Sequence, residues 1–169
     1  MHDTHDRPET EETTPGDHSS TQATPPRPPP VSDEEARLYY AGLPSRPLLV
    51  ARTGTTPFEL PTGPEAYPKL KELRIAGNHK IKEIWEDNLG LKVIAILDEK
   101  KVLWTSIDVV RFGYEEEPSG NVVIWIGVKP GSLSREHGMD VALQCKGLLL
   151  DHNLDDVDVE IRESLVIRY

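Results

Sequence analysis

The sequence predicts an α+β fold, built on a small mixed sheet of three to four strands with helices on one face. Residues 122–128 form a nearly continuous apolar run, which is typical of a strand at the centre of a sheet. Residues 156–169 alternate charged and apolar residues with period two, which indicates a strand with one buried face. Residues 134–151 carry apolar residues at helical spacing, so a helical crossover is expected to join the two strands.

A β-hairpin precedes the central strand. Residues 102–112 are rich in β-branched and aromatic residues, which favour strands. Residues 115–120 then contain three acids, a proline and a glycine, a composition typical of a hairpin connection. The predicted sheet therefore combines this hairpin with the C-terminal strand that the crossover reaches.

A short helix is expected near the start of the domain. Ser32 and Glu35 have the spacing of a capping box, in which each side chain bonds the other residue's backbone N–H. The helix is predicted to run from Asp33 to about Tyr40, because Gly42 then interrupts the pattern.

A second helical region follows. Asn78 is the predicted N-cap of one helix, which Asn88 and Gly90 end or kink. Residues 91–100 are ambiguous: their apolar spacing fits a helix, while 93–97 taken alone fits a strand. We favour the helix, because a charged connection follows it.

The chain divides by composition into a leader and one domain. Residues 1–32 are acidic and rich in proline, serine and threonine, so little of this segment can be buried and disorder is predicted. Residues 33–169 are predicted to form a single domain. Within it, 33–77 is loop-rich apart from a candidate short strand at 48–51, and 78–169 holds the helices and the sheet.

Composition limits the function classes. The 169 residues are 37% hydrophobic, enough for one ordinary core. The net charge of −10 argues against an electrostatic grip on nucleic acid or on an anionic membrane. A single cysteine forbids an intrachain disulfide, and no apolar stretch approaches the roughly 18 residues of a membrane-spanning helix. These features predict an intracellular protein, without distinguishing cytoplasm from nucleus.

The C-terminal strand suggests a metal site. Asp156, Asp158 and Glu160 are spaced to project from one face of that strand, and Asp108 is positioned to join them from a neighbouring strand. Carboxylate oxygens are the ligands that Mg²⁺ and Ca²⁺ prefer. The favoured alternative is an ordinary solvated strand face, which the same alternation produces.

The loop before the crossover helix suggests an anion site. Lys129, Gly131, Ser132 and Ser134 lie where backbone N–H groups of a helix N-terminus are free to bind phosphate or nucleotide. Neither a Gly-x-Gly-x-x-Gly pattern nor a P-loop is present. An ordinary serine N-cap is therefore the favoured interpretation.

No sequence pattern indicates a reaction. Cys145 lies too far along its helix from His137 to pair with it, and a buried apolar cysteine is the default interpretation. No nucleophile elbow, His-Glu-x-x-His or Cys-x-x-Cys motif occurs. The sequence accordingly implies no cofactor and leaves enzymatic activity undecided, leaning against it.

Four stretches resemble an expanded group of uncharacterised proteins from mushroom-forming fungi. They are Tyr-Ala-Gly-Leu-Pro-Ser-Arg-Pro at 40–47, Gly-Asn-His at 77–79, Trp-Thr-Ser-Ile-Asp-Val-Val-Arg at 104–111 and Asp-Val-Asp-Val-Glu-Ile-Arg-Glu-Ser at 156–164. The resemblance covers about 38–166. Longer members continue into a region similar to trypsin-like proteases, so the resemblance implies that this chain corresponds to their N-terminal domain alone. It carries over no catalytic residue.

Three functional hypotheses follow. The first is a non-catalytic accessory or interaction domain of a larger or split protein, with a protein partner or a missing downstream domain. The second is a small metal-dependent or hydrolytic enzyme that uses the acidic sheet face. The third is an anion- or nucleotide-binding module at 129–134. The C-terminal strand is also a candidate sheet edge, which would invite pairing with a second copy.

Overall fold

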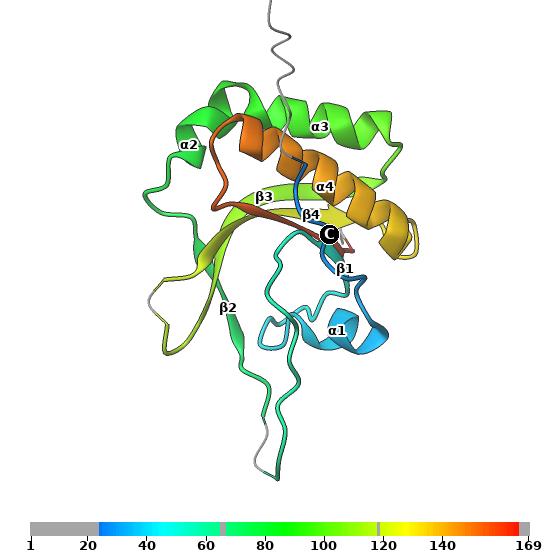
Figure 1. The fold of residues 1–169 in the computed structure, drawn as a ribbon, viewed down its shortest axis with the longest axis vertical. Coiled ribbons are helices and arrows are strands. Elements are labelled where there is room, and N and C mark those ends of the chain that lie inside the picture. The colour runs from blue at the N-terminus through cyan, green and yellow to red at the C-terminus, as the bar shows by residue number, and fades with distance from the viewer. Residues whose placement is uncertain (1–23, 65–66, 118, 166–169) are drawn as a thin grey trace, which may run out of the picture.

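The structure is a computed structural model, which describes residues 24–64, 67–117 and 119–165. Its centre is a five-stranded mixed sheet of order β1-β5-β4-β3-β2 (Figure 1). Only β4 and β5 are parallel, and every other neighbouring pair is antiparallel. The strands are β1 (Leu49–Arg52), β2 (Lys71–Ile75), β3 (Trp104–Tyr114), β4 (Asn121–Val128) and β5 (Asp158–Glu163). The α+β class is confirmed, but the predicted count of three to four strands was too low.

The predicted hairpin and crossover are both present. Strands β3 and β4 form the hairpin, and α4 (Arg135–Asp151) carries the chain from β4 to its parallel neighbour β5. The position of β5 corrects one expectation, because it lies between β1 and β4 rather than at an edge of the sheet. Its backbone is therefore already paired on both sides, and the edges of the sheet are β1 and β2.

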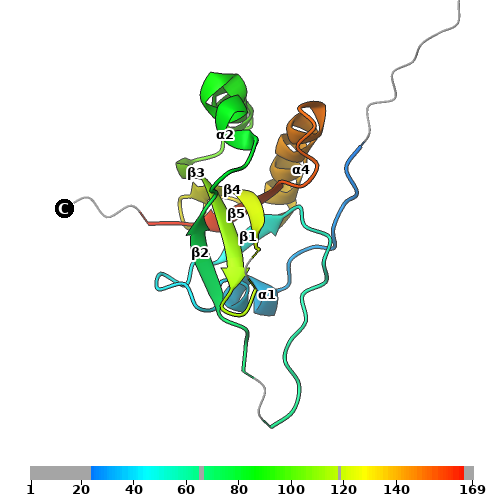
Figure 2. The same cartoon turned by 90° about the vertical axis from the view of Figure 1, so that its left-hand side faces the viewer.

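One face of the sheet is covered by a single layer of two helices. Helices α3 (Gly90–Glu99) and α4 lie side by side over it, as Figures 1 and 2 show from two directions. The core beneath them is apolar throughout: Ile124, Ile126, Val159 and Ile161 of the sheet pack with Val93, Leu97, Cys145 and Leu149 of the helices. Burial of such side chains stabilises the fold by about 1.5–3 kcal/mol each.

The helical region at 81–99 does not end at Asn88 or Gly90, one of the two outcomes expected there. Helix α2 (Ile81–Ile84) passes through a π-helical turn, η1 (Trp85–Leu89), directly into α3. Gly90 permits this continuity rather than ending the helix, since a Cβ there would lie 3.2 Å from the Trp85 ring. The helical interpretation of 91–100 is confirmed. The helix begins at Ile81, after Asn78, and the His79 ring accepts the Ile81 N–H in place of the expected cap.

The opposite face of the sheet carries α1 (Asp33–Leu38), so helices are not confined to one face (Figure 2). The Ser32 N-cap is confirmed, because its hydroxyl accepts the Glu35 N–H. The Glu35 side chain turns away to pair with Arg52. A second core cluster forms here, consisting of Val31, Ala36, Tyr40, Leu43, Leu49, Phe112, Val123 and Trp125.

Part of the predicted leader packs on the domain. Val31 is buried in the second core cluster, its carbonyl accepts from Arg135, and Arg27 pairs with Asp140 of α4. These contacts place residues 27 and 31 against the domain, residues 1–23 lie outside the described part, and the disorder of 1–32 stays a prediction. Within that described part, no helix combines the length and apolarity that crossing a membrane requires.

Candidate functional site: a pocket with buried charges

A pocket of about 540 Å³ opens on the face of the sheet that carries α1. Its floor comes from β2, β3, β4 and β5, and its outer wall comes from residues 54–61 and 67–69, which belong to the long loop at the bottom of Figure 1. The wall is largely apolar, with Phe58, Leu60, Pro61 and Tyr67 lining it. The floor is charged, and its polar side chains are described in turn below.

Glu160 lies at the centre of the floor. It is buried, and its two carboxylate oxygens accept hydrogen bonds from the Tyr39 hydroxyl at 2.6 Å and the Tyr40 hydroxyl at 2.8 Å. The Tyr40 oxygen in turn accepts from Trp125 Nε1 at 3.0 Å. Burial, and then the charge of Glu160, raise the pKa of both tyrosines far above the ordinary value, so both hydroxyls remain donors.

Arg52 and Glu35 form a buried ion pair beside this centre. Arg52 Nε donates to Glu35 Oε1 at 2.6 Å, and the two side chains are 8% and 9% exposed. The other Arg52 nitrogens donate to the carbonyls of Gly54 at 2.9 Å and Thr56 at 2.8 Å. One guanidinium therefore joins α1 to the start of the loop that forms the pocket wall.

Lys71 completes the floor. Its Nζ lies 3.3 Å from the centre of the Tyr39 ring and within 6 Å of the Tyr40 and Phe112 rings, and it makes no hydrogen bond to any described residue. Burial, together with the nearby Arg52 charge, lowers the pKa of Lys71 to about 8 against the opposing effect of the acids. Lys71 is thus a buried amine with aromatic neighbours and an unused donor.

The backbone holds Lys71 in place. Its N–H donates to the Ala41 carbonyl at 2.7 Å, just after α1. Gly42 makes this approach possible: its φ is +102°, and a Cβ would lie 2.7 Å from both the nitrogen and the oxygen of Lys71. The chain after α1 and strand β2 are therefore joined at the pocket, which fixes the lysine against the tyrosines.

The floor is electrically balanced. Glu160 and Glu35, which bonds Arg52 from behind the lining, carry two negative charges, and Arg52 and Lys71 carry two positive charges when protonated; all four residues are buried. Asp158 also lines the pocket, and Lys146, 3.4 Å from it, balances its charge. Burying charge is costly even when it is paired, and apolar residues of similar volume often serve stability better. Such a cluster in a pocket is a physical indication of a functional site.

The predicted metal ligands do not meet. Glu160 is in the pocket, and Asp108 lies elsewhere on the sheet, 3.9 Å from Arg162. Asp158 accepts from Thr53 and lies 3.4 Å from Lys146. Among the described residues, no group of three or more histidine, cysteine or acidic side chains could hold a metal ion.

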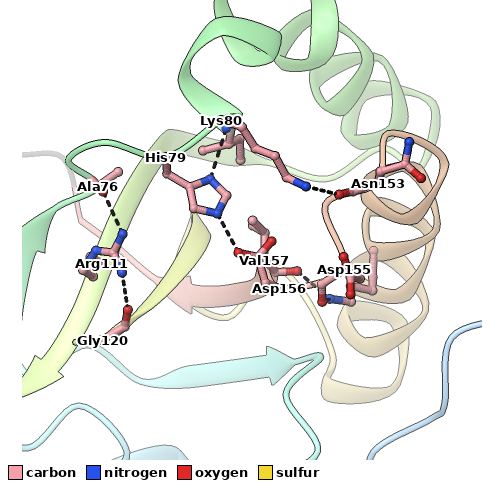
Figure 3. Close-up of polar contacts among 11 residues, drawn as sticks. Ala76, His79, Lys80, Arg111, Gly120, Asn153, Asp155, Asp156 and Val157 are labelled. Carbon is pink, nitrogen blue, oxygen red and sulfur yellow. Dashed lines mark hydrogen bonds and ion pairs between the residues drawn. The ribbon is translucent and has the colours of Figure 1, made fainter.

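Asp156, the fourth predicted ligand, has a structural partner. It lies before β5, and its Oδ2 is 2.7 Å from Nε2 of His79 (Figure 3). The other ring nitrogen of His79, Nδ1, accepts the Ile81 N–H. This hydrogen bond from His79 lowers the pKa of Asp156. The favoured interpretation of a solvated strand face also fails at Glu160, because α1 and the tyrosines after it cover that position.

Two donors of the predicted anion loop bond to other groups of the chain. The Gly131 N–H donates to Glu163 at 2.9 Å, and the Ser132 hydroxyl donates to the Lys129 carbonyl. Ser134 is the N-cap of α4 and accepts the His137 N–H at 3.2 Å, which confirms the ordinary capping interpretation. Cys145 is buried in the helix-side core, and burial raises the pKa of its thiol to about 12.

Of the charged residues at the pocket floor, Asp158 and Glu160 were candidates from sequence, whereas Arg52 and Lys71 were not. Arg52 follows the apolar run 48–51, and a charged residue there was the one available signal that this short strand has a polar side. Comparison with known proteins found no matching family model, curated protein or solved structure.

Proposed function

We propose that this chain is a non-catalytic binding domain whose ligand is a small, uncharged organic molecule held in the pocket. The observation that carries the proposal is the buried set of Glu35, Arg52, Lys71 and Glu160 beneath an open cavity. A fold that needed only stability would gain by filling this space with apolar side chains. A ligand bound above these four charged residues would explain why the pocket keeps them.

Charge balance supports an uncharged ligand. The floor is neutral as a whole when all four groups are ionised, so a bound anion or cation would leave an uncompensated charge in a desolvated site. A neutral group that accepts a hydrogen bond suits the unused donor of Lys71. A carbonyl oxygen has this property.

The cavity supports a ligand of modest size. Its volume of about 540 Å³ lies within the usual range for small-molecule sites, and an apolar wall over a polar floor is their usual composition. Both oxygens of Glu160 are engaged by tyrosines, and the described lining contains no serine, cysteine or histidine. Binding therefore fits this lining better than hydrolysis.

This proposal develops the sequence-based hypothesis of an accessory or interaction domain of a larger or split protein. The relation to the fungal group and an intracellular location remain part of that proposal. The metal-dependent enzyme loses its suggested ligand set, since the four carboxylates have separate partners. The anion module has less support, since two of its suggested donors, the Gly131 N–H and the Ser132 hydroxyl, bond within the chain.

The test uses the full chain and prodan, a neutral naphthyl ketone whose emission shifts to the blue in apolar surroundings. We expect saturable binding with a blue shift. Phe58→Ser on the wall should weaken binding at least tenfold. Leu91→Ser, which removes an exposed apolar side chain of α3 outside the pocket lining, should leave binding unchanged. An unshifted emission, or equal loss in both variants, would contradict the proposal.

A further inference from the structure

We infer that Lys71 captures aldehydes in this pocket as a reversible imine. The inference rests on the proposed binding function and names its ligand class: an aldehyde with an apolar or aromatic body. Two features carry it, namely an amine with no hydrogen-bond partner among the described residues and a cavity in front of that amine.

The first requirement of imine formation is an accessible amine in a fixed position. Lys71 lines the pocket, and its Nζ is surrounded by Tyr39, Tyr40 and Phe112 rather than tied to a carboxylate by an ion pair within 4 Å. The backbone contact with Ala41 fixes the strand that carries it. The amine is therefore positioned but uncommitted.

The second requirement is an unprotonated nitrogen. Burial lowers the pKa of Lys71 to about 8, so about a quarter of the molecules carry a free amine at pH 7.5. An ordinary lysine, with a pKa near 10.4, has only about one free amine in a thousand at that pH. The advantage over the surface lysines is therefore on the order of a hundredfold in nucleophile concentration.

The reaction balances without another reactant. The nitrogen lone pair of Lys71 adds to the aldehyde carbon, and the carbonyl oxygen takes a proton to give a carbinolamine. Loss of its hydroxyl as water then forms the C=N bond. Nothing is oxidised or reduced, and addition of water reverses the sequence.

The surroundings fit the product as well as the reactants. A protonated imine carries the same single positive charge as the lysine ammonium, so the balance with Glu35 and Glu160 is kept. One proton passes from the nitrogen to the oxygen of the adduct through solvent in the open pocket, and solvent supplies the second proton with which the hydroxyl leaves as water. The body of the aldehyde would lie along Phe58 and Leu60 on the apolar wall.

The test treats the full chain with 2-naphthaldehyde and sodium cyanoborohydride, which reduces an imine to a stable amine, and locates the product by peptide mass spectrometry. We expect Lys71 to be labelled at least ten times faster than any other lysine at pH 7.5. Lys71→Arg should abolish the fast labelling, and Lys92→Arg on α3, outside the pocket lining, should preserve it. Denaturation in urea should erase the preference.

Labelling spread over the exposed lysines, with none favoured at Lys71, would overturn the inference. Prodan binding measured on the same samples separates the two proposals. If prodan binds and Lys71 is not trapped, imine capture fails and the binding function stands. If neither occurs, both fail. The labelling rate should also be measured against pH. A rate that rises near pH 8 at Lys71, and only at higher pH at the other lysines, would support the inference further.

Discussion

The two faces of the sheet follow different rules, and β5 displays both within a single strand. Val159 and Ile161 enter the apolar core beneath α3 and α4, whereas Glu160 and Arg162 lie buried on the other face. The core beneath α3 and α4 is apolar, and the buried ammonium of Lys146 on α4 donates to the carbonyls of Asp155 and Val157. The α1 face instead buries ions, a hydrogen-bonded pair of tyrosines and an open pocket.

This difference indicates that alternate residues of the strand have different roles, one set in stability and the other in the pocket. The apolar face supplies most of the free energy of folding, because burial of hydrocarbon is favourable without further conditions. The charged face is destabilised when a paired ion such as Arg52 or Glu35 loses its partner, because an isolated buried charge is strongly penalised. The predictions below test whether the two faces separate in this way.

The largest effect is expected from breaking the Glu35–Arg52 pair. Arg52→Met leaves the Glu35 carboxylate buried without its partner and should lower the free energy of unfolding by about 3–5 kcal/mol. Adding Glu35→Leu removes the orphan charge and should restore most of that loss. Urea unfolding of the single and double variants measures both. A double variant as unstable as Arg52→Met would show that the loop contacts of Arg52, and not the charge, dominate.

The apolar face should respond without such rescue. Ile161→Ala opens a cavity beneath the helices and should cost about 2–5 kcal/mol, while the affinity for prodan stays within about twofold. Glu160→Gln, at the neighbouring position, should weaken prodan binding instead. Urea unfolding and fluorescence titration on both variants give the comparison. Equal effects on binding would mean that the two faces are coupled rather than independent.

Sequence patterns predicted the elements whose polarity matches their burial. The β3–β4 hairpin, α4 and β5 follow this rule, because their apolar residues enter the core at the expected period. Strand β2 inverts it: Lys71 is buried, while Leu73 and Ile75 are 50% and 86% exposed. An inverted pattern cannot be recognised as a strand from hydrophobic periodicity.

The pocket escaped prediction for a related reason. Alternation correctly placed Glu160 on the face opposite Ile161, but burial of that carboxylate depends on where α1 and the tyrosines after it pack. Its partners come from residues more than a hundred positions away in the chain. No local sequence pattern therefore predicts that Tyr39 and Tyr40 pack against Glu160.

A smaller effect should appear as a pH dependence. Folded Lys71 releases its proton near pH 8, whereas the unfolded chain keeps it to about pH 10.4, so the unfolded state binds more protons between these values. The free energy of unfolding of the native protein should therefore rise with pH relative to Lys71→Met, by roughly 2 kcal/mol between pH 7 and 10. Buried tyrosines and Cys145 titrate in both proteins, so the difference isolates Lys71. A constant difference would mean that the lysine keeps its proton.

The smallest effect is expected at Arg27–Asp140, a pair with the same chemistry as Arg52–Glu35 but exposed to solvent. The nitrogen–oxygen distances are 2.8 Å and 2.6 Å, yet the side chains are 54% and 56% exposed instead of 8% and 9%. Water screens the exposed pair, so Arg27→Ala should change the free energy of unfolding by less than about 1 kcal/mol, and salt should reduce even that. A loss as large as that of Arg52→Met would show that docking of residues 24–32 depends on this contact, and that burial is not what separates the two ion pairs.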